Sequence, residues 1–320
     1  MKQYIIRRVL LMIPILIGVS FLIYMIFTLA PGNIVTVRST GHMTAATQAK
    51  MMHEYHLDQP KVVQYLYWAK DAIVGNFGES YKFKAPVSKV MGEFIWNSFF
   101  LSLASFIAAF AIAIPIGIIS ATKQYSIFDK VFTVISLAGI SIPSFFLGLV
   151  LIKIFAIDLP IFPLSGMTTT GSNNTGLAFV GDVLYHMVLP FLVLTFQSIA
   201  SIMRYVRTSM LEVIRQDYIR TARAKGLKEK VVIYKHALRN GLIPVITLFG
   251  ILLPSLFAGA IVTEYIFSWP GIGNVTLQAV NVRDYPLLMG INMLLAVLTL
   301  VGNLIADVSY AVVDPRIRLK

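Results

Sequence analysis

The stretch DYIRTARAKGLKEKVVIYKHALRNGLIPV, residues 217–245, is a strongly basic segment in a very apolar chain. It contains seven Lys and Arg residues, and Gly226 interrupts it. The whole chain has 320 residues, of which 57% are hydrophobic and only 13% are charged, whereas soluble domains have about 25% charged residues. Together with a mean hydropathy of +0.76, this composition predicts an integral membrane protein. The absence of Cys excludes disulfides.

Six long segments without charges lie around the basic stretch. Each has at least 21 residues, and a helix needs roughly 20 residues to cross a bilayer. Backbone groups inside lipid must satisfy their own hydrogen bonds, which favours helices here, because membrane strands would alternate over about 10 residues. We therefore predict an all-α integral membrane protein with six transmembrane helices and both termini on one side. The predicted spans are Val9–Ala30, Phe94–Thr122, Val131–Ile152, Val183–Met203, Leu242–Thr263 and Tyr285–Ala306.

The net charge of +12 fits either nucleic-acid binding or the rule that cytoplasmic loops carry Lys and Arg. The six spans decide between them, because 18 of the 27 basic residues fall on one side. That side holds the two termini, the loop around 123–130 and the segment 204–239. Most other cations lie in the long loop 31–93, where this rule has little weight. We expect a cytoplasmic basic segment, both termini cytoplasmic, and no nucleic-acid partner.

The N-terminal run and the loop after it each allow two interpretations. A signal peptide is one for the start, but 22 apolar residues without a clear cleavage site favour an uncleaved helix. In the loop, Ala45–Leu57 and Val62–Val74 have helical periodicity, and Gln59–Pro60 separates them. This predicts a small extracytoplasmic cap. His53, Glu54 and His56 could suggest a metal site, but they do not form HExxH, and a solvated helix is favoured.

The sequence contains no motif for an energy source of its own. The phosphate-binding pattern GxxxxGK[ST] is absent. Ion-driven carriers keep ionisable groups in the middle of the membrane, whereas Lys153, Glu264 and Asp307 lie near the ends of predicted spans. We therefore predict a non-catalytic membrane subunit that binds no cofactor and depends on partners for energy. A self-sufficient channel or secondary carrier is the alternative from another class.

The basic stretch itself predicts a short helix that stops at Gly226. Asp217 is a plausible N-cap, and the cations Arg223 and Lys225 fall in the last turn, where the helix dipole favours them. Glycine is common at the C′ position after such a turn. A second helical segment then leads into the fifth predicted span.

Two roles suit this bent cytoplasmic element. Tyr218, Ala222 and Lys225 can share one helix face, and the small side chains of Ala222 and Ala224 would let another protein surface approach closely. Docking to a partner is therefore one interpretation. A juxtamembrane helix resting on anionic lipid is the other, and spacing alone leaves both open.

The motif YIRTARAKGL…HALRNGLIPV resembles the EAA loop of ABC importer permeases, in its peptide-permease form. In that family the loop forms a coupling helix that inserts into a cleft of the ATPase subunit. Arg220, Thr221 and Ala222 stand where the general motif has Glu-Ala-Ala, so two of these three positions depart from it. The resemblance assigns ATPase coupling to Asp217, Tyr218, Arg220, Thr221, Ala222, Arg223, Ala224, Lys225, Gly226 and Leu227.

Three more segments are similar to the B-type subunit of oligopeptide and dipeptide permeases: RRVLLMIPILIGVSFLIYMIFTLAPGN, TEYIFSWPGIGNVTLQAVNVRDYPLLMG and DVSYAVVDPRIR. The resemblance implies a type I ABC importer permease fold in a bacterial cell membrane, forming a peptide path by alternating access. It implies a homologous C-type permease, an extracytoplasmic binding protein, membrane lipid and two ABC ATPase subunits that use ATP and Mg. Nickel, an opine or another solute is the alternative cargo.

The resemblance also divides the chain and suggests a gate. The expected units are an N-terminal helix (1–30), the extracytoplasmic cap (31–93), the permease domain (94–308, with the coupling loop 206–240) and a cytoplasmic tail (309–320). Within IFSWPGIG, Trp269 is expected at the outer interface and Pro270–Gly271 as a turn. The family places this segment near the external gate, with Glu264 facing a wet cavity or pairing with the partner subunit. Residues that contact substrate are not predicted.

Overall fold

The computed structural model describes residues 2–30, 44–54 and 56–313. Across these residues the chain is helical, with no β-structure beyond an isolated bridge between Glu79 and Pro86. The predicted all-α class is therefore confirmed. The elements are α1 (Lys2–Leu29), α3 (Ala45–Glu54), α4 (Lys61–Ile73), α5 (Val87–Thr122), α6 (Ile127–Ser141), α7 (Ser144–Ile152), the π-helix η1 (Lys153–Asp158), α8 (Gly176–Ile214), α9 (Asp217–Ala224), α10 (Glu229–Val231), the π-helix η2 (Val232–Ala237), α11 (Leu238–Gly241), α12 (Ile243–Leu252), α13 (Ser255–Ala258), α14 (Ile261–Ile266), α15 (Ile272–Asn281) and α16 (Tyr285–Val313).

Four of the described helices are long and apolar enough to cross a bilayer without a break: α1, α5, α8 and α16. The predicted third span, Val131–Ile152, is not a straight helix, because α6 and α7 meet at an angle of 100°. Pro143 causes this break. It lacks an N–H and forces the preceding residue out of the helical region, so Ile142 has φ −78° and ψ 120°. The bent pair counts as a fifth candidate span.

The predicted fifth span, Leu242–Thr263, is divided into the short helices α12, α13 and α14. Pro254 stands between α12 and α13, and Gly259 follows α13 with a φ of +72° that ends the helix. Prolines inside the predicted spans, Pro115, Pro143, Pro190 and Pro254, indicated kinks, so the break at Pro254 fits the sequence, whereas the break at Gly259 was not expected. The total of six spans therefore stays a prediction.

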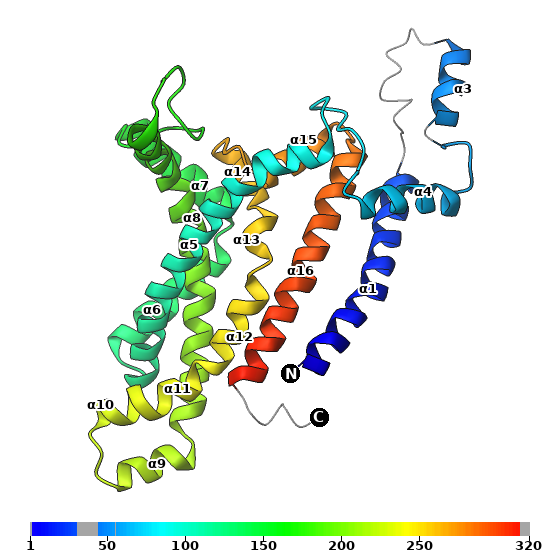
Figure 1. Cartoon of the computed structure of the whole chain (residues 1–320). Coiled ribbons are helices and arrows are strands. Elements are labelled where there is room, and N and C mark those ends of the chain that lie inside the picture. The colour runs from blue at the N-terminus through cyan, green and yellow to red at the C-terminus, as the bar shows by residue number, and fades with distance from the viewer. Residues whose placement is uncertain (1, 31–43, 55, 314–320) are drawn as a thin grey trace.

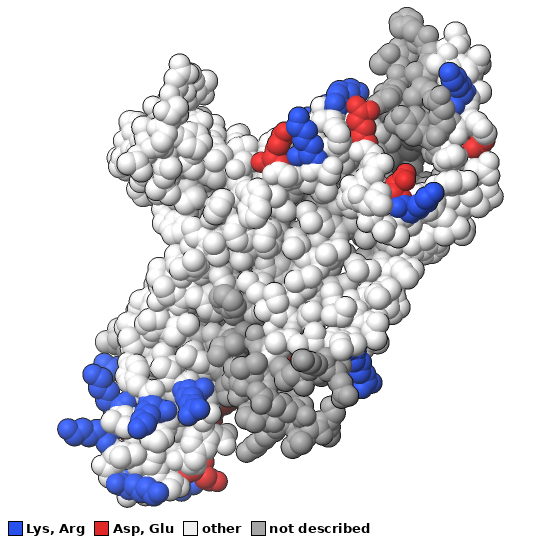
Figure 2. All heavy atoms as spheres, viewed as in Figure 1, with Lys and Arg blue, Asp and Glu red and all other residues white. Residues whose placement is uncertain are grey.

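The helices give the molecule two distinct ends (Figure 1). We call the end that carries α9, α10 and α11 the basic end, and α1 begins and α16 finishes at that same end. We call the opposite end, with α3, α4 and α15, the cap end. Figure 2 shows Lys and Arg side chains gathered over the basic end, whereas the visible face of the cap end carries both signs of charge.

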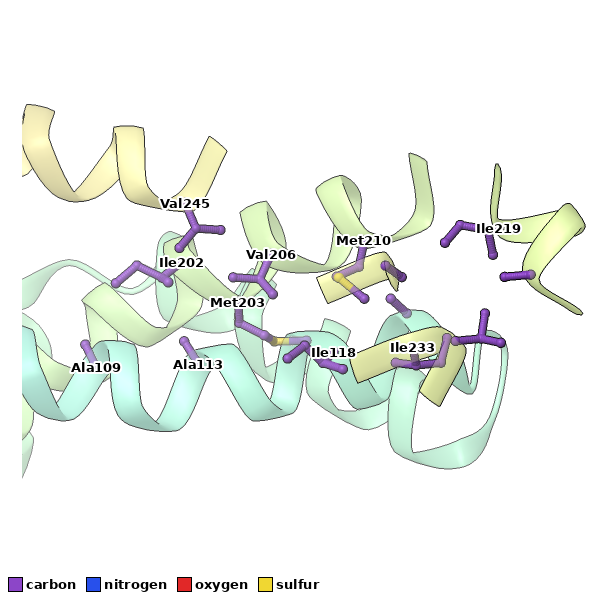
Figure 3. Close-up of a cluster of buried hydrophobic side chains, with 14 residues drawn as sticks. Ala109, Ala113, Ile118, Ile202, Met203, Val206, Met210, Ile219, Ile233 and Val245 are labelled. Atoms are coloured by element: carbon purple, nitrogen blue, oxygen red, sulfur yellow. The ribbon is translucent and has the colours of Figure 1, made fainter. Parts of the chain in front are cut away.

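The long helices α5 and α8 pack along each other and form the centre of the core (Figure 3). Small residues on α5 allow this close approach. Ala109 and Ala113 are fully buried, and a Cβ at Gly117 would lie 2.8 Å from the Cβ of Val206 on α8. Small residues at the contact are the usual way in which membrane helices gain close packing.

The predicted cap helices are present as α3 and α4, with Pro60 directly before α4. Side chains on α4 fix it against α1. The hydroxyls of Tyr65 and Ser20 lie 2.9 Å apart, and Tyr24 donates to Oε1 of Gln64 at 3.3 Å. Nδ1 of His53, in the last turn of α3, lies 2.9 Å from a carboxylate oxygen of Asp58 in the turn before α4, which raises the pKa of the imidazole.

Candidate functional site

Helix α8 carries the candidate coupling segment beyond the apolar part of the molecule. Its 39 residues span roughly 58 Å at 1.5 Å per residue, against about 30 Å for the hydrocarbon core. Its last turns therefore extend past the bilayer. They contain Arg204 and Arg207, and Arg215 follows as the C-cap. After α8 the chain turns at Gln216 and enters α9.

The start of α9 differs by one residue from the prediction. Gln216, with φ −73° and ψ 149°, is the N-cap, and no side chain caps the helix. Asp217 is the first helical residue, so the proposed N-cap was wrong. In this place its carboxylate still lies at the positive end of the helix dipole, 3.5 Å from Arg220.

The end of α9 is as predicted. Gly226 has a φ of +73°, and its N–H donates to the carbonyl of Arg223 at 2.9 Å. The N–H of Lys225 donates to the carbonyl of Thr221 at 3.0 Å. Nothing lies within 4 Å of the position that a Cβ on Gly226 would take, so the glycine is required by its backbone conformation and not by a lack of space.

Helix α9 is held by one buried face. Ile219 is fully buried and Ala222 is 7% exposed, and both belong to the core cluster that includes Met210, Val232 and Ile233 (Figure 3). Their spacing of three residues puts them on one side of the helix. The expectation that Ala222 faces a partner is therefore wrong, because η2 packs against this side and makes it part of the protein's own core.

The other side of α9 is open to solvent. Tyr218 is 44% exposed and Leu227, just after the helix, is 40% exposed. Lys and Arg side chains lie around these apolar groups, and Figure 2 shows them at this end of the molecule. We call this surface the docking face, and it consists of the exposed residues Tyr218, Arg220, Thr221, Ala224, Lys225 and Leu227. Asp217 and Arg223 border it.

Polar contacts connect α9 to the elements around it. Arg223 donates two hydrogen bonds to the carboxylate of Glu229, at 3.1 and 2.7 Å, and so closes the turn around Gly226. These bonds lower the pKa of the Glu229 carboxyl and raise that of Arg223. Nδ2 of Asn240 donates to the hydroxyl of Tyr218 at 3.0 Å. The short helix is thus positioned by its neighbours on both sides.

Two further contacts connect the C-terminal part of α8 to the rest of the basic end. Ser209 donates to the carbonyl of Gly241 on α11 at 2.8 Å. Arg207 makes a two-pronged ion pair with Asp129 on α6, with distances of 2.6 and 2.9 Å. Two-pronged Arg–carboxylate pairs fix geometry as well as adding attraction. A displacement of α9 would therefore be passed to α8, α6 and α11 together.

The candidate gate segment is packed inside the protein. Glu264 is fully buried, and it accepts hydrogen bonds from the Ser98 hydroxyl at 2.7 Å and from the N–H groups of Ala260 and Asn274 at 3.0 Å. The expectation of a wet cavity or a partner contact for Glu264 was therefore wrong. A Cβ on Gly273 would lie 2.9 Å from its carboxylate, so glycine is needed for the backbone to come this close.

Trp269 and the turn after it are attached to α5. Trp269 is 1% exposed and its Nε1–H donates to the carbonyl of Asn97 at 3.1 Å, so its indole packs inside the protein. Its predicted level at the outer interface stays a prediction. The predicted turn is present, because the N–H of Gly271 donates to the carbonyl of Trp269 at 2.8 Å. Asn97 also donates to the carbonyl of Pro270 at 2.7 Å. Asn97 and Ser98 carried no signal in the sequence, whereas the glycines at 259, 271 and 273 around one Glu could have suggested a buried carboxylate.

Comparison with known proteins gives matches along nearly the whole chain. Residues 113–319 match the model of the family described as binding-protein-dependent transport system inner membrane component, and residues 1–98 match the N-terminal model of such components. The oligopeptide transport system permease protein AppB of Bacillus subtilis (strain 168) is 43% identical, covering 99% of both chains. The dipeptide transport system permease protein DppB of Escherichia coli (strain K12) is 38% identical, covering 100% of both.

A solved structure supports the fold. The inward-facing MetNI methionine ABC transporter contains a chain that aligns with a TM-score of 0.52 and 18% identity, covering 70% of the present chain and 96% of that one. At this identity the likeness concerns the fold alone. It agrees with the permease fold that the sequence motifs implied.

Proposed function

Because the chain belongs to the family of binding-protein-dependent transport system inner membrane components, we propose that it is the B-type permease subunit of an ATP-driven peptide importer. Two relatives that match over their full lengths are named permease proteins for oligopeptides and dipeptides. Such a chain is a non-catalytic membrane subunit. Its partners would be a homologous C-type permease, two ATPase subunits that use ATP and Mg, and an extracytoplasmic binding protein.

The observation that carries the proposal is the two-sided character of α9. Its docking face is exposed and basic, while Ile219 and Ala222 on the other side lie in a core shared with α5 and α8. A partner bound to the docking face would therefore move a rigid unit and not an isolated loop. Rigid-body movement of helices is one established route by which such transitions are transmitted. In alternating access, the ATPase subunits would use this contact to open and close the path between the two permeases.

The proposed organisation keeps the units inferred from the sequence: 1–30, 31–93, 94–308 with the coupling loop 206–240, and 309–320. We propose that the basic end is cytoplasmic, since the cations gathered there follow the rule for cytoplasmic loops. The external gate would include the segment 264–271. With Glu264 and Trp269 buried, that segment would act as a fixed wall attached to α5 and not through exposed side chains.

The test is transport by the assembled complex in proteoliposomes. The chain is purified with the proposed permease, ATPase and binding-protein partners, and uptake of a labelled tripeptide is measured with and without ATP. We expect ATP-dependent uptake that disappears when this chain is left out. Uptake of nickel or an opine, with no uptake of any peptide, would support the alternative cargo. Uptake by this chain alone would support the channel or carrier interpretation.

A further inference from the structure

Two adjoining cavities lie at the cap end between α1, α4 and α16. The first has a volume of about 430 Å³ and reaches Tyr24 on α1 and Tyr285 on α16. The second has a volume of about 460 Å³ and reaches Leu16 on α1 and Leu294 on α16. Both volumes are typical of ligand sites. Since these contacts lie two turns or more further along both helices, the second cavity is the deeper one in the membrane region.

The two cavities differ in chemistry. The upper one has charged side chains in a mixed lining, namely Lys61, Asp71 and Glu79 beside many aromatic and apolar side chains. The lower one is lined almost entirely by apolar side chains such as Ile17 and Val297. A cavity with charged groups above an apolar one matches a molecule with a charged head and a hydrocarbon tail.

Trp68 on α4 lines both cavities. Its Nε1 atom is buried and, among the residues that the structure describes, finds no hydrogen-bond partner. Indole nitrogen can only donate, and buried donors in native proteins nearly always have an acceptor. A molecule bound here would have to bring an acceptor oxygen to this buried nitrogen to supply the missing partner.

Helix α4 has the character of a helix that lies in a membrane surface. It crosses one end of α1 (Figure 1), and apolar side chains on and just after it are strongly exposed: Leu66 is 60%, Ile73 is 86% and Val74 is 79% exposed. Apolar side chains on such a helix are buried among lipids in the interface. The site below α4 is also prebuilt, because Gln64 and Tyr65 are buried and bonded to α1 or to the preceding turn.

We propose that the paired cavities bind one phospholipid with an ammonium headgroup, such as phosphatidylethanolamine, from the leaflet at the cap end. An acyl chain would occupy the lower cavity. In the upper cavity Lys61 would pair with the phosphate, and the carboxylates of Asp71 and Glu79 would pair with the ammonium group. Trp68 would donate its Nε1–H to an ester or phosphate oxygen. This site is independent of which solute the protein transports.

Native mass spectrometry of the full-length chain, purified with its partners in a mild detergent, tests the site. Phosphatidylethanolamine or phosphatidylglycerol is added at equal concentration, and bound lipid is counted. We expect retention of phosphatidylethanolamine in preference to phosphatidylglycerol. Trp68→Phe, which keeps the ring but loses the donor, and Lys61→Gln should each weaken retention roughly tenfold, as expected for a bond to a charged group.

Two matched variants serve as controls. Trp96→Phe changes an exposed indole on α5 outside both cavities, and Lys70→Gln removes a cation of α4 that lines neither. Both should retain lipid like the wild type. If Trp68→Phe fails to fold, Ala72→Leu decides instead, since it fills the lower cavity with apolar volume and should expel the lipid.

Three results would overturn the proposal. The first is unchanged retention in both Trp68→Phe and Ala72→Leu. The second is equal retention of the two lipids, which would contradict the proposed recognition of the ammonium group. The third is displacement of the bound lipid by a short peptide at equal concentration, which would mean that the cavity is a peptide site.

Discussion

At the scale of single residues, Gly226 is the position where backbone conformation and proposed function meet most directly. Valine there meets no steric obstacle but must adopt a φ of +73°, at a cost of about 1 kcal/mol or more, or let α9 continue. One added helical residue would rotate the following segment by about 100°. We expect Gly226→Val to insert normally while losing most of the ATPase subunits on co-purification at matched expression.

The control for this variant is Gly171→Val. Gly171 also has a positive φ, +79°, with open space around it, but it lies in the loop before α8, far from the docking face. It should keep its ATPase subunits. Full attachment and normal transport in Gly226→Val would contradict the coupling role and favour a helix that rests on lipid.

Glu264 allows a second test at this scale. Its Oε1 accepts from the Ser98 hydroxyl and the Ala260 N–H, and its Oε2 accepts from the Asn274 N–H. An amide there can keep one oxygen as an acceptor, but its NH₂ group must then face the donor on the other side. Buried donors left without an acceptor cost about 1–3 kcal/mol each. We expect Glu264→Gln to lower the thermal midpoint of the purified protein by several degrees, measured by size-exclusion after heating. Glu93→Gln, at an exposed site on α5, should leave the midpoint unchanged.

At the scale of elements, α9 contains two alanines that lie in different environments. Ala222 is buried in the core and Ala224 is exposed on the docking face. We expect Ala222→Asp to place an unpaired charge among Ile219, Val232 and Ile233, so that α9 no longer packs against η2. Trypsin should then cleave the chain after Arg223 faster than in the wild type. Ala224→Asp should keep the wild-type cleavage rate and lose ATPase attachment only. Equal cleavage rates in both variants would contradict the claim that the Ala222 side of α9 is buried and the Ala224 side is exposed.

The same helix explains which features could be predicted from the sequence. The stop at Gly226 and the break at Pro60 were predicted because glycine and proline act on their own backbone. The buried side of α9 was not, because Ala222 becomes internal only when η2, which begins ten residues later, packs against it. Prolines inside the apolar spans indicated possible kinks, but not that Pro143 would bend its span by 100° while Pro115 and Pro190 stay inside unbroken helices.

The gate segment illustrates a second limit. The enrichment of tryptophan at membrane interfaces did not predict that the indole of Trp269 is internal and bonded to Asn97, 172 residues earlier in the chain. Glu264 was expected in a wet cavity because its partner Ser98, on α5, is similarly distant in the sequence. Long-range partners of this kind have no periodicity or local motif, so only the assembled helices reveal them.

At the scale of the whole molecule, the orientation in the membrane determines what the docking face can meet. The wild type has no Cys, so single cysteines report topology without further changes. We expect Lys230→Cys, exposed at the basic end, to escape an impermeant thiol reagent in intact cells and to react after permeabilisation. Asn174→Cys, exposed in the loop before α8 towards the other end, should react in both conditions. Labelling of Lys230→Cys in intact cells would place the docking face outside the cell, where no ATPase subunit could reach it. That result would contradict both the proposed orientation and the proposed coupling role of α9.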